Sequence, residues 1–123
     1  MKGKRLLVVD DEETIRVLFK EELEEEGFMV DVASGGEEAL AMLEENDYDL
    51  VILDVKMPGM DGMQTLQEMR KRGRHMPVVL CSAYSEFRTD LTSWLSEAYV
   101  VKSSDMRDLK EVIRRLLGES TGV

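Results

Sequence analysis

Short apolar runs alternate with longer amphipathic segments along this chain. Five such runs occur, most of them rich in valine: Leu6–Val9, Met29–Val32, Leu50–Leu53, Val78–Cys81 and Tyr99–Val101. Nearly continuous apolar runs of this length are typical of strands that are covered on both faces of a parallel sheet. The pattern therefore predicts five buried β-strands.

The segments between and after these runs place apolar residues three and four positions apart, as an amphipathic helix requires. Four stripes are clear: Ile15, Leu18, Phe19 and Leu23; Ala39, Leu40 and Leu43; Met63, Leu66 and Met69; and Leu109, Val112, Ile113, Leu116 and Leu117. A further stripe, Phe87, Leu91 and Leu95, lies among Thr and Ser residues, which are weak helix formers. We expect a short or mobile helix there.

Polar residues ahead of the stripes predict the starts of three helices. Ser34 with Glu37 fits a capping box, in which each side chain bonds the other residue's backbone amide. Asp61 is expected to be the N-cap of the third helix, and Ser104 or Asp105 that of the last.

Alternating strands and helices predict an α/β fold with one parallel sheet and helices on both of its faces. Ligands of such doubly wound sheets bind at the carboxyl ends of the strands, where the strand order reverses. We expect one domain over residues 1–123, of which 119–123 form a frayed tail.

Charge and cysteine content narrow the classes of function. The net charge of −10 disfavours direct contact with nucleic acid or with anionic membranes, since both require a basic face. A single cysteine, Cys81, excludes an internal disulfide and suits a reducing compartment. Since no apolar run approaches the roughly 20 residues of a membrane-spanning helix, we expect a cytoplasmic protein.

Polar residues follow four of the predicted strands. They are Asp10 and Asp11 after the first, Asp54 after the third, Ser82 after the fourth and Lys102 after the fifth. All lie at carboxyl ends of parallel strands, so they converge if the first and third strands are neighbours. Clustered carboxylates repel one another, and their oxygen atoms are the ligands that Mg²⁺ prefers. A carboxylate can also act as a covalent nucleophile when positive charge compensates the transferred group.

The chain resembles the receiver domain of two-component response regulators. The resemblance covers essentially the whole chain and lies in four motifs: Val8-Val9-Asp10-Asp11-Glu12; Leu53-Asp54-Val55-Lys56-Met57-Pro58-Gly59-Met60-Asp61-Gly62; Ser82-Ala83-Tyr84; and Tyr99-Val100-Val101-Lys102. It implies a (βα)₅ flavodoxin-like three-layer sandwich whose parallel five-stranded sheet has the order 2-1-3-4-5.

The resemblance also implies a role for each site residue. Asp54 is the expected phospho-acceptor and also a ligand of the metal, Asp11 binds Mg²⁺ directly and Asp10 acts mainly through bound water. Mn²⁺ is an alternative metal. Lys56 offers its backbone carbonyl to the metal. Because Lys56 and Tyr84 lie two residues after Asp54 and Ser82, we also expect their side chains to flank the phosphoryl group and limit the access of water.

The remaining residues are expected to report phosphorylation. By the resemblance, Lys102 pairs with the phosphoryl group, Ser82 moves toward it and Tyr99 turns inward, which changes the face formed by the fourth helix, fifth strand and fifth helix. The implied donor is a histidine kinase or a phosphotransfer protein. The output passes through an effector protein or self-association, without direct contact with nucleic acid or membrane.

Two departures from the family pattern keep other functions open. Lys102 is followed by Ser103, where the family usually has proline, and the segment between Ser82 and Tyr99 is short. The alternative is therefore a degenerate receiver that binds proteins independently of phosphorylation. An enzyme with an aspartyl-phosphate intermediate usually has a second acid two residues after the nucleophile, where this chain has Lys56. We therefore expect a phospho-acceptor and no enzyme, capable at most of self-phosphorylation from small phosphodonors and of self-dephosphorylation.

Overall fold

The computed structural model describes residues 3–83, 96–103 and 105–118. Its elements are β1 (Arg5–Val9), α1 (Glu13–Glu25), β2 (Met29–Ala33), α2 (Gly36–Glu45), β3 (Leu50–Asp54), α3 (Gly62–Lys71), β4 (Val78–Ser82), β5 (Ala98–Val101) and α4 (Arg107–Leu116). Each predicted strand is present and is one residue longer than predicted. The weak helix expected around Phe87, Leu91 and Leu95 lies outside the described residues, so α4 is the last of the predicted helices.

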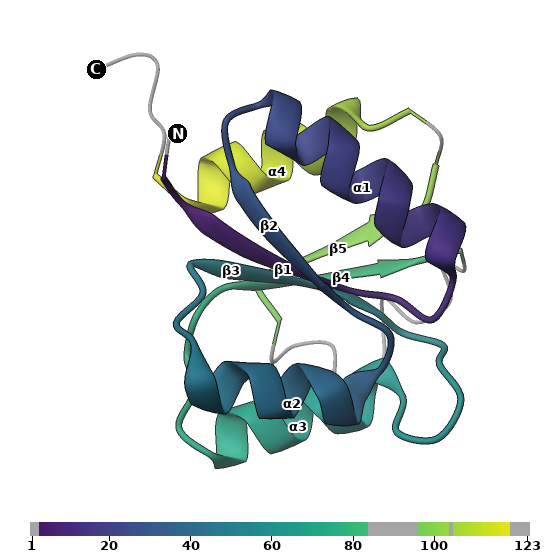
Figure 1. The fold of residues 1–123 in the computed structure, drawn as a ribbon, viewed down its shortest axis with the longest axis vertical. Helices are drawn as coiled ribbons and strands as arrows, with labels where there is room; N and C mark the ends of the chain where they lie inside the picture. Colours follow the sequence, from purple (N-terminus) through teal and green to yellow (C-terminus); the bar gives the residue numbers. More distant parts are fainter. Residues whose placement is uncertain (1–2, 84–95, 104, 119–123) are drawn as a thin grey trace.

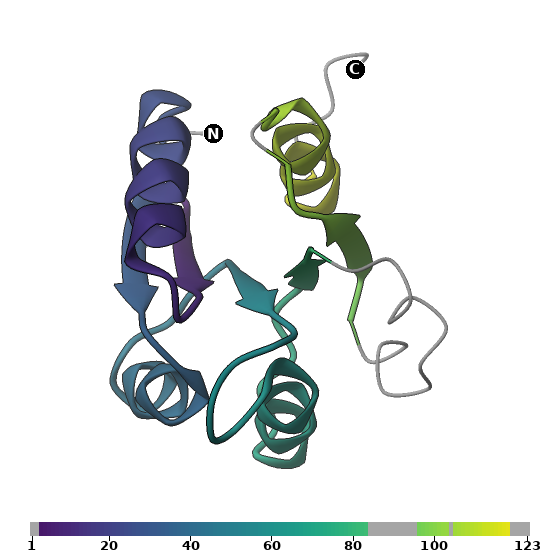
Figure 2. The same ribbon diagram turned by 90° about the vertical axis from the view of Figure 1, so that its right-hand side faces the viewer.

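The five strands form one parallel sheet in the order β2-β1-β3-β4-β5. Helices α1 and α4 cover one face of the sheet, and α2 and α3 cover the other (Figure 1, Figure 2). The doubly wound α/β architecture and the strand order predicted above are therefore confirmed. The order reverses between β1 and β3, and this is the position at which such folds bind ligands.

Alternation along the strands divides the core into two layers. Leu6 and Val8 pack with Phe19, Leu23 and other residues beneath α1 and α4. Their neighbours along β1 point to the opposite face, because successive strand side chains alternate, and there Leu7 and Val9 pack with residues of α2 and α3, including Leu40, Leu43, Leu66 and Met69. The predicted helix stripes supply both layers, and Cys81 is buried in the first as the small apolar residue expected from its place in a strand.

The helix starts agree only in part with the sequence prediction. Asp61 is the N-cap of α3, and with Gln64 it forms a complete capping box. The box predicted for Ser34 and Glu37 is wrong. Gly35 is the N-cap of α2, and the Ser34 hydroxyl donates to Glu38 at 2.8 Å. The predicted box does not form because α2 begins one residue later than a box of Ser34 and Glu37 requires.

A polar cluster ties the edge strand β2 to β1 and to the segment before β3. The Tyr48 hydroxyl donates to Asp31 Oδ2 at 2.6 Å, and the Arg5 guanidinium donates to the same oxygen at 2.9 Å. Arg5 also lies over the Tyr48 ring, 5.1 Å from its centroid. These contacts stabilise the edge of the sheet. Within residues 3–83, 96–103 and 105–118, no helix combines the length and the apolar character needed to cross a membrane.

Candidate functional site

Strand register brings the predicted site residues to one edge of the sheet. Val9 of β1 is paired with Leu53 of β3, so the residues that follow, Asp10 and Asp54, lie level with each other. Asp54 is in turn paired with Cys81, and Ser82 with Val101. Asp54 and Ser82 are the last residues of their strands rather than the first residues after them, and both are buried.

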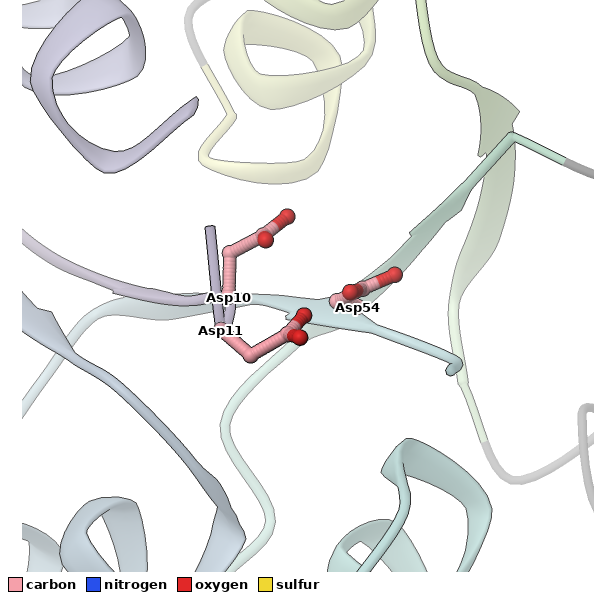
Figure 3. Close-up of side chains that lie close together, drawn as sticks. All are labelled: Asp10, Asp11 and Asp54. Carbon is pink, nitrogen blue, oxygen red and sulfur yellow. The ribbon is translucent and has the colours of Figure 1, made fainter. Parts of the chain in front are cut away.

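Three carboxylates gather at this edge. Asp10, Asp11 and Asp54 each offer an oxygen within 4.8 Å of the others. Figure 3 shows the Asp11 carboxylate extending from the end of β1 toward Asp54 at the end of β3, with Asp10 beside them. Asp10 and Asp54 are buried, with 2% and 4% of their surface exposed, whereas Asp11 is exposed. The cluster therefore has two buried acids and one that faces solvent.

The buried acids share one cation. Lys102 Nζ lies 2.7 Å from Asp10 Oδ2 and 3.3 Å from Asp54 Oδ1. The Lys102 amide donates to the Ser82 carbonyl at 2.6 Å, so the backbone after β5 is tied to the end of β4. Lys102 enters the site although Ser103, rather than proline, follows it.

Burial and charge change the acidity of this cluster. Burial raises the pKa of Asp54 to about 7, and the Asp10 carboxylate adds to the rise, although Lys102 opposes it. For Lys102, burial acts to lower the pKa. The hydrogen bond to Asp10 and the charges of Asp54 and Asp10 outweigh burial, and the pKa is raised. Lys102 is therefore a cation at neutral pH, whereas ionising Asp54 costs free energy.

A cavity of about 210 Å³ opens beside Asp54. Its lining combines carboxylates, cations and a hydroxyl: Asp11, Glu12, Asp54, Lys56, Ser82, Ala83 and Lys102. The structure thus brings together most of the predicted site residues around a space that a small anionic group could enter.

Two predicted residues do not line this cavity. Tyr99 is half-buried and packs against the core layer formed with α2 and α3. Asp10 lies against Lys102, and its Oδ1 accepts the Glu12 amide at 2.9 Å. Tyr84 lies outside the described residues.

Two residues near the site had no assigned role in the sequence analysis. Glu12 lines the cavity, and its Oε1 is 3.9 Å from Lys102 Nζ. Arg16 of α1 donates to the Asp10 carbonyl oxygen at 2.6 Å and so holds the loop after β1. The position of Glu12 directly after two aspartates was a usable signal. No sequence signal pointed to Arg16, because it contacts the backbone of Asp10 and a backbone contact leaves no residue pattern.

The donor set fits a hard divalent cation. Three carboxylates supply only oxygen atoms and carry negative charge that a cation would offset, which is the ligand chemistry that Mg²⁺ favours. The exposed position of Asp11 leaves this side of the cluster open to solvent, as an ion that retains water ligands requires. The residues present are therefore suited to a divalent metal site.

Comparison with known proteins gives a consistent family. The family model of the response regulator receiver domain matches residues 6–114. The chain is 35% identical to the regulatory protein AtoC of Escherichia coli (strain K12) over 92% of its own length. It is 31% identical to sporulation initiation phosphotransferase F of Bacillus subtilis (strain 168), over 95% of this chain and 96% of that protein. The chain spans only 25% of AtoC and about half of other regulators that it matches.

Solved structures agree with this family. The response regulator TrrA of Thermotoga maritima, in a structure that contains Mg²⁺ and BeF, is 50% identical and has a TM-score of 0.89, with 92% of this chain and 98% of that chain covered. TrrA was also solved in complex with the histidine kinase ThkA, and that structure gives a TM-score of 0.87, with 94% of this chain and 99% of that chain covered.

Proposed function

Because this chain belongs to the response regulator receiver domain family of two-component systems, we propose that it is a signalling module that accepts a phosphoryl group on Asp54. The observation that carries the proposal is the shared cation: Lys102 contacts both Asp10 and Asp54, although the three residues come from different strand ends. A strand-end aspartate that served only as a cap or turn residue would not require this buried arrangement. The cavity beside Asp54 supplies the space for the transferred group.

The proposed chemistry is a nucleophilic displacement at phosphorus. A carboxylate oxygen of Asp54 forms a bond to the phosphorus of a donor phosphohistidine, and the phosphorus–nitrogen bond breaks with its electron pair passing to the imidazole. Positive charge at the transferred group lowers the barrier to such transfers. Lys102 would supply one such charge, and the Ser82 hydroxyl, which lines the same cavity, would donate to a phosphoryl oxygen.

A bound Mg²⁺ would neutralise the clustered acids and the incoming phosphoryl oxygens. We propose that Asp11 and Asp54 bind it directly, that Asp10 acts through water, and that the Lys56 carbonyl completes the protein ligands. Mn²⁺ is expected to substitute, since it prefers the same oxygen donors. TrrA, whose structure contains Mg²⁺ and BeF, supports this choice of metal.

Phosphorylation would alter the contacts of Lys102. A phosphoryl group adds a charge of about −2, next to an ammonium group that Asp10 holds at 2.7 Å in the unphosphorylated protein. We propose that Lys102 then moves toward the phosphoryl group together with Ser82, and that Tyr99 turns inward. These changes would reach the face that includes β5 and α4, through which an effector protein or a second copy of the chain would bind.

The proposed donor is a histidine kinase or a phosphotransfer protein. The relative TrrA binds the histidine kinase ThkA, which supports a donor of this class. Net charge −10 favours protein partners over direct contact with nucleic acid.

The test is incubation of the protein with a small phosphodonor and Mg²⁺, followed by intact mass measurement. We expect one added phosphoryl group in the wild type and none in Asp54→Asn, with beryllofluoride and Mg²⁺ binding only the wild type. An unchanged mass together with no beryllofluoride binding would remove the proposal. The same experiment with Mn²⁺ tests the choice of metal.

A further inference from the structure

The first residue of α3 lies directly on the backbone of Asp54. The Gly62 amide donates to the Val55 carbonyl at 2.9 Å, which closes the loop from residue 55 to residue 62. A Cβ atom added at position 62 would lie 2.0 Å from the Asp54 carbonyl oxygen and 2.8 Å from Val55 Cα. Gly62 is not among the glycines with positive φ, so the requirement for glycine here is one of space rather than of backbone conformation.

Neither side of this contact can yield easily. The atoms that a Cβ would meet belong to the backbone, so no side chain can rotate away. Asp54 ends a central strand that is paired with β1 on one side and β4 on the other. Helix α3 is held by the buried residues Leu66 and Met69 and by the capping box of Asp61 and Gln64. A clash at position 62 must therefore be relieved by the loop between them, which carries Lys56.

We propose that Gly62 is a positioning residue for the phospho-acceptor. By lacking a side chain, it lets the first turn of α3 rest on the Asp54 carbonyl, and this contact holds Asp54 and the Lys56 carbonyl at the separation that the metal site needs. The inference rests on the proposed function. A methyl group at position 62 needs at least 1.0 Å of displacement (3.0 − 2.0) before its closest contact reaches the shortest distance that real Cβ atoms show. A misplacement of about 1 Å can lower the rate of a positioned reaction on the order of 100-fold.

The test compares Gly62→Ala with Gly36→Ala. Gly36 is also the buried first residue of a helix, and a Cβ there would lie 2.1 Å from Thr65 Oγ1, a side-chain atom. The nearest backbone atom it would meet is the Met60 carbonyl oxygen, at 3.2 Å rather than the 2.0 Å found at position 62. The Mg²⁺ dissociation constant is measured by calorimetry, under conditions in which circular dichroism shows that both variants are folded. The phosphorylation rate is measured per folded molecule. We expect Gly62→Ala to bind Mg²⁺ at least about tenfold more weakly and to react correspondingly more slowly. We expect Gly36→Ala to lose stability, to keep wild-type affinity, and to regain stability when Thr65→Ala is added.

A folded Gly62→Ala protein with wild-type Mg²⁺ affinity would overturn the proposal, as would an equal loss of affinity in Gly36→Ala. If Gly62→Ala does not fold, the pair Asp61→Ala and Asp61→Asn tests the same first turn. Both remove one charge, but asparagine keeps the cap, so weaker Mg²⁺ binding by Asp61→Ala alone is expected and equal binding refutes the inference. The proposed function has a separate readout, since it fails if the wild-type protein accepts no phosphoryl group.

Discussion

Replacing Asp54 by asparagine is expected to make the metal-free protein more stable. Asparagine has nearly the same shape but carries no charge, so the substitution removes a buried carboxylate without leaving a cavity. In the folded protein, burial and the Asp10 carboxylate raise the pKa of Asp54 from 3.8 to about 7. The ionised side chain therefore opposes folding at neutral pH, even though it lies 3.3 Å from the Lys102 ammonium.

The size of the effect follows from linkage. Between the unfolded pKa of 3.8 and the folded pKa of about 7, the folded protein keeps a proton on Asp54 that the unfolded chain has lost, so wild-type stability falls as pH rises through this range. The shift of about 3 pH units corresponds to on the order of 4 kcal/mol above pH 7. At about pH 5 the same reasoning predicts that the substitution increases the free energy of unfolding by less than about 2 kcal/mol.

The assay is urea unfolding with a metal chelator present, at about pH 7.5 and about pH 5, because linkage predicts a larger difference at the higher pH. The expected gain corresponds to a melting temperature higher by on the order of 10 °C. Asp61→Asn is the matched control, because asparagine caps helices as well as aspartate does and its stability should stay close to that of the wild type. Adding Mg²⁺ should narrow the gap, since only the wild type retains all three carboxylates to bind it.

Two results would refute this reasoning. One is an Asp54→Asn protein that is no more stable than the wild type at the higher pH. The other is a gain that does not shrink at the lower pH, because that would show that the ionisation of Asp54 is not its source.

Three further substitutions test other contacts. Lys102→Met should lower the free energy of unfolding, measured with urea, by about 3 kcal/mol, because it leaves two buried acids without their cation. The loss should be smaller when Asp54→Asn is also present. Tyr48→Phe should raise the pKa of Asp31, which the hydrogen bond from Tyr48 and then Arg5 hold below its ordinary value. A lowered carboxyl pKa stabilises the folded protein above the unfolded pKa, and this stability is lost as the pH falls through the folded pKa. The variant should therefore lose less folding stability on acidification than the wild type does. An unchanged Asp31 pKa by NMR titration would contradict this assignment. Leu66→Ala, at a fully buried site, should cost about 2–5 kcal/mol in thermal unfolding.

Local pattern was enough for most of the fold. Nearly continuous apolar runs that alternate with amphipathic helices are typical of strands covered on both faces, so five parallel strands were predictable from the pattern. Their order, 2-1-3-4-5, followed from the resemblance to receiver domains. The helix caps were less predictable from the sequence. Asp61 was identified correctly, but Ser34 bonds Glu38 rather than Glu37. Both glutamates lie within reach of Ser34 in sequence, and only the turn at which α2 begins selects between them.

Part of the site followed from topology, because the carboxyl ends of neighbouring parallel strands must lie together. This placed Asp10, Asp11 and Asp54 at one edge before any coordinates were known. The arrangement of Lys102 did not follow, since it depends on distances between side chains from three strands. Its ammonium lies nearer to Asp10 than to Asp54, at 2.7 Å against 3.3 Å.

The sequence by itself determined which residues could do the chemistry, since residue type and order settle charge, nucleophilicity and position at a strand end. Only the tertiary structure decided how those groups act on one another. Burial of Asp54 beside Asp10 raises its pKa to about 7, and the backbone contact at Gly62 leaves no room for a side chain. Both effects depend on separations of a few ångströms between segments far apart in the chain, and packing sets those separations.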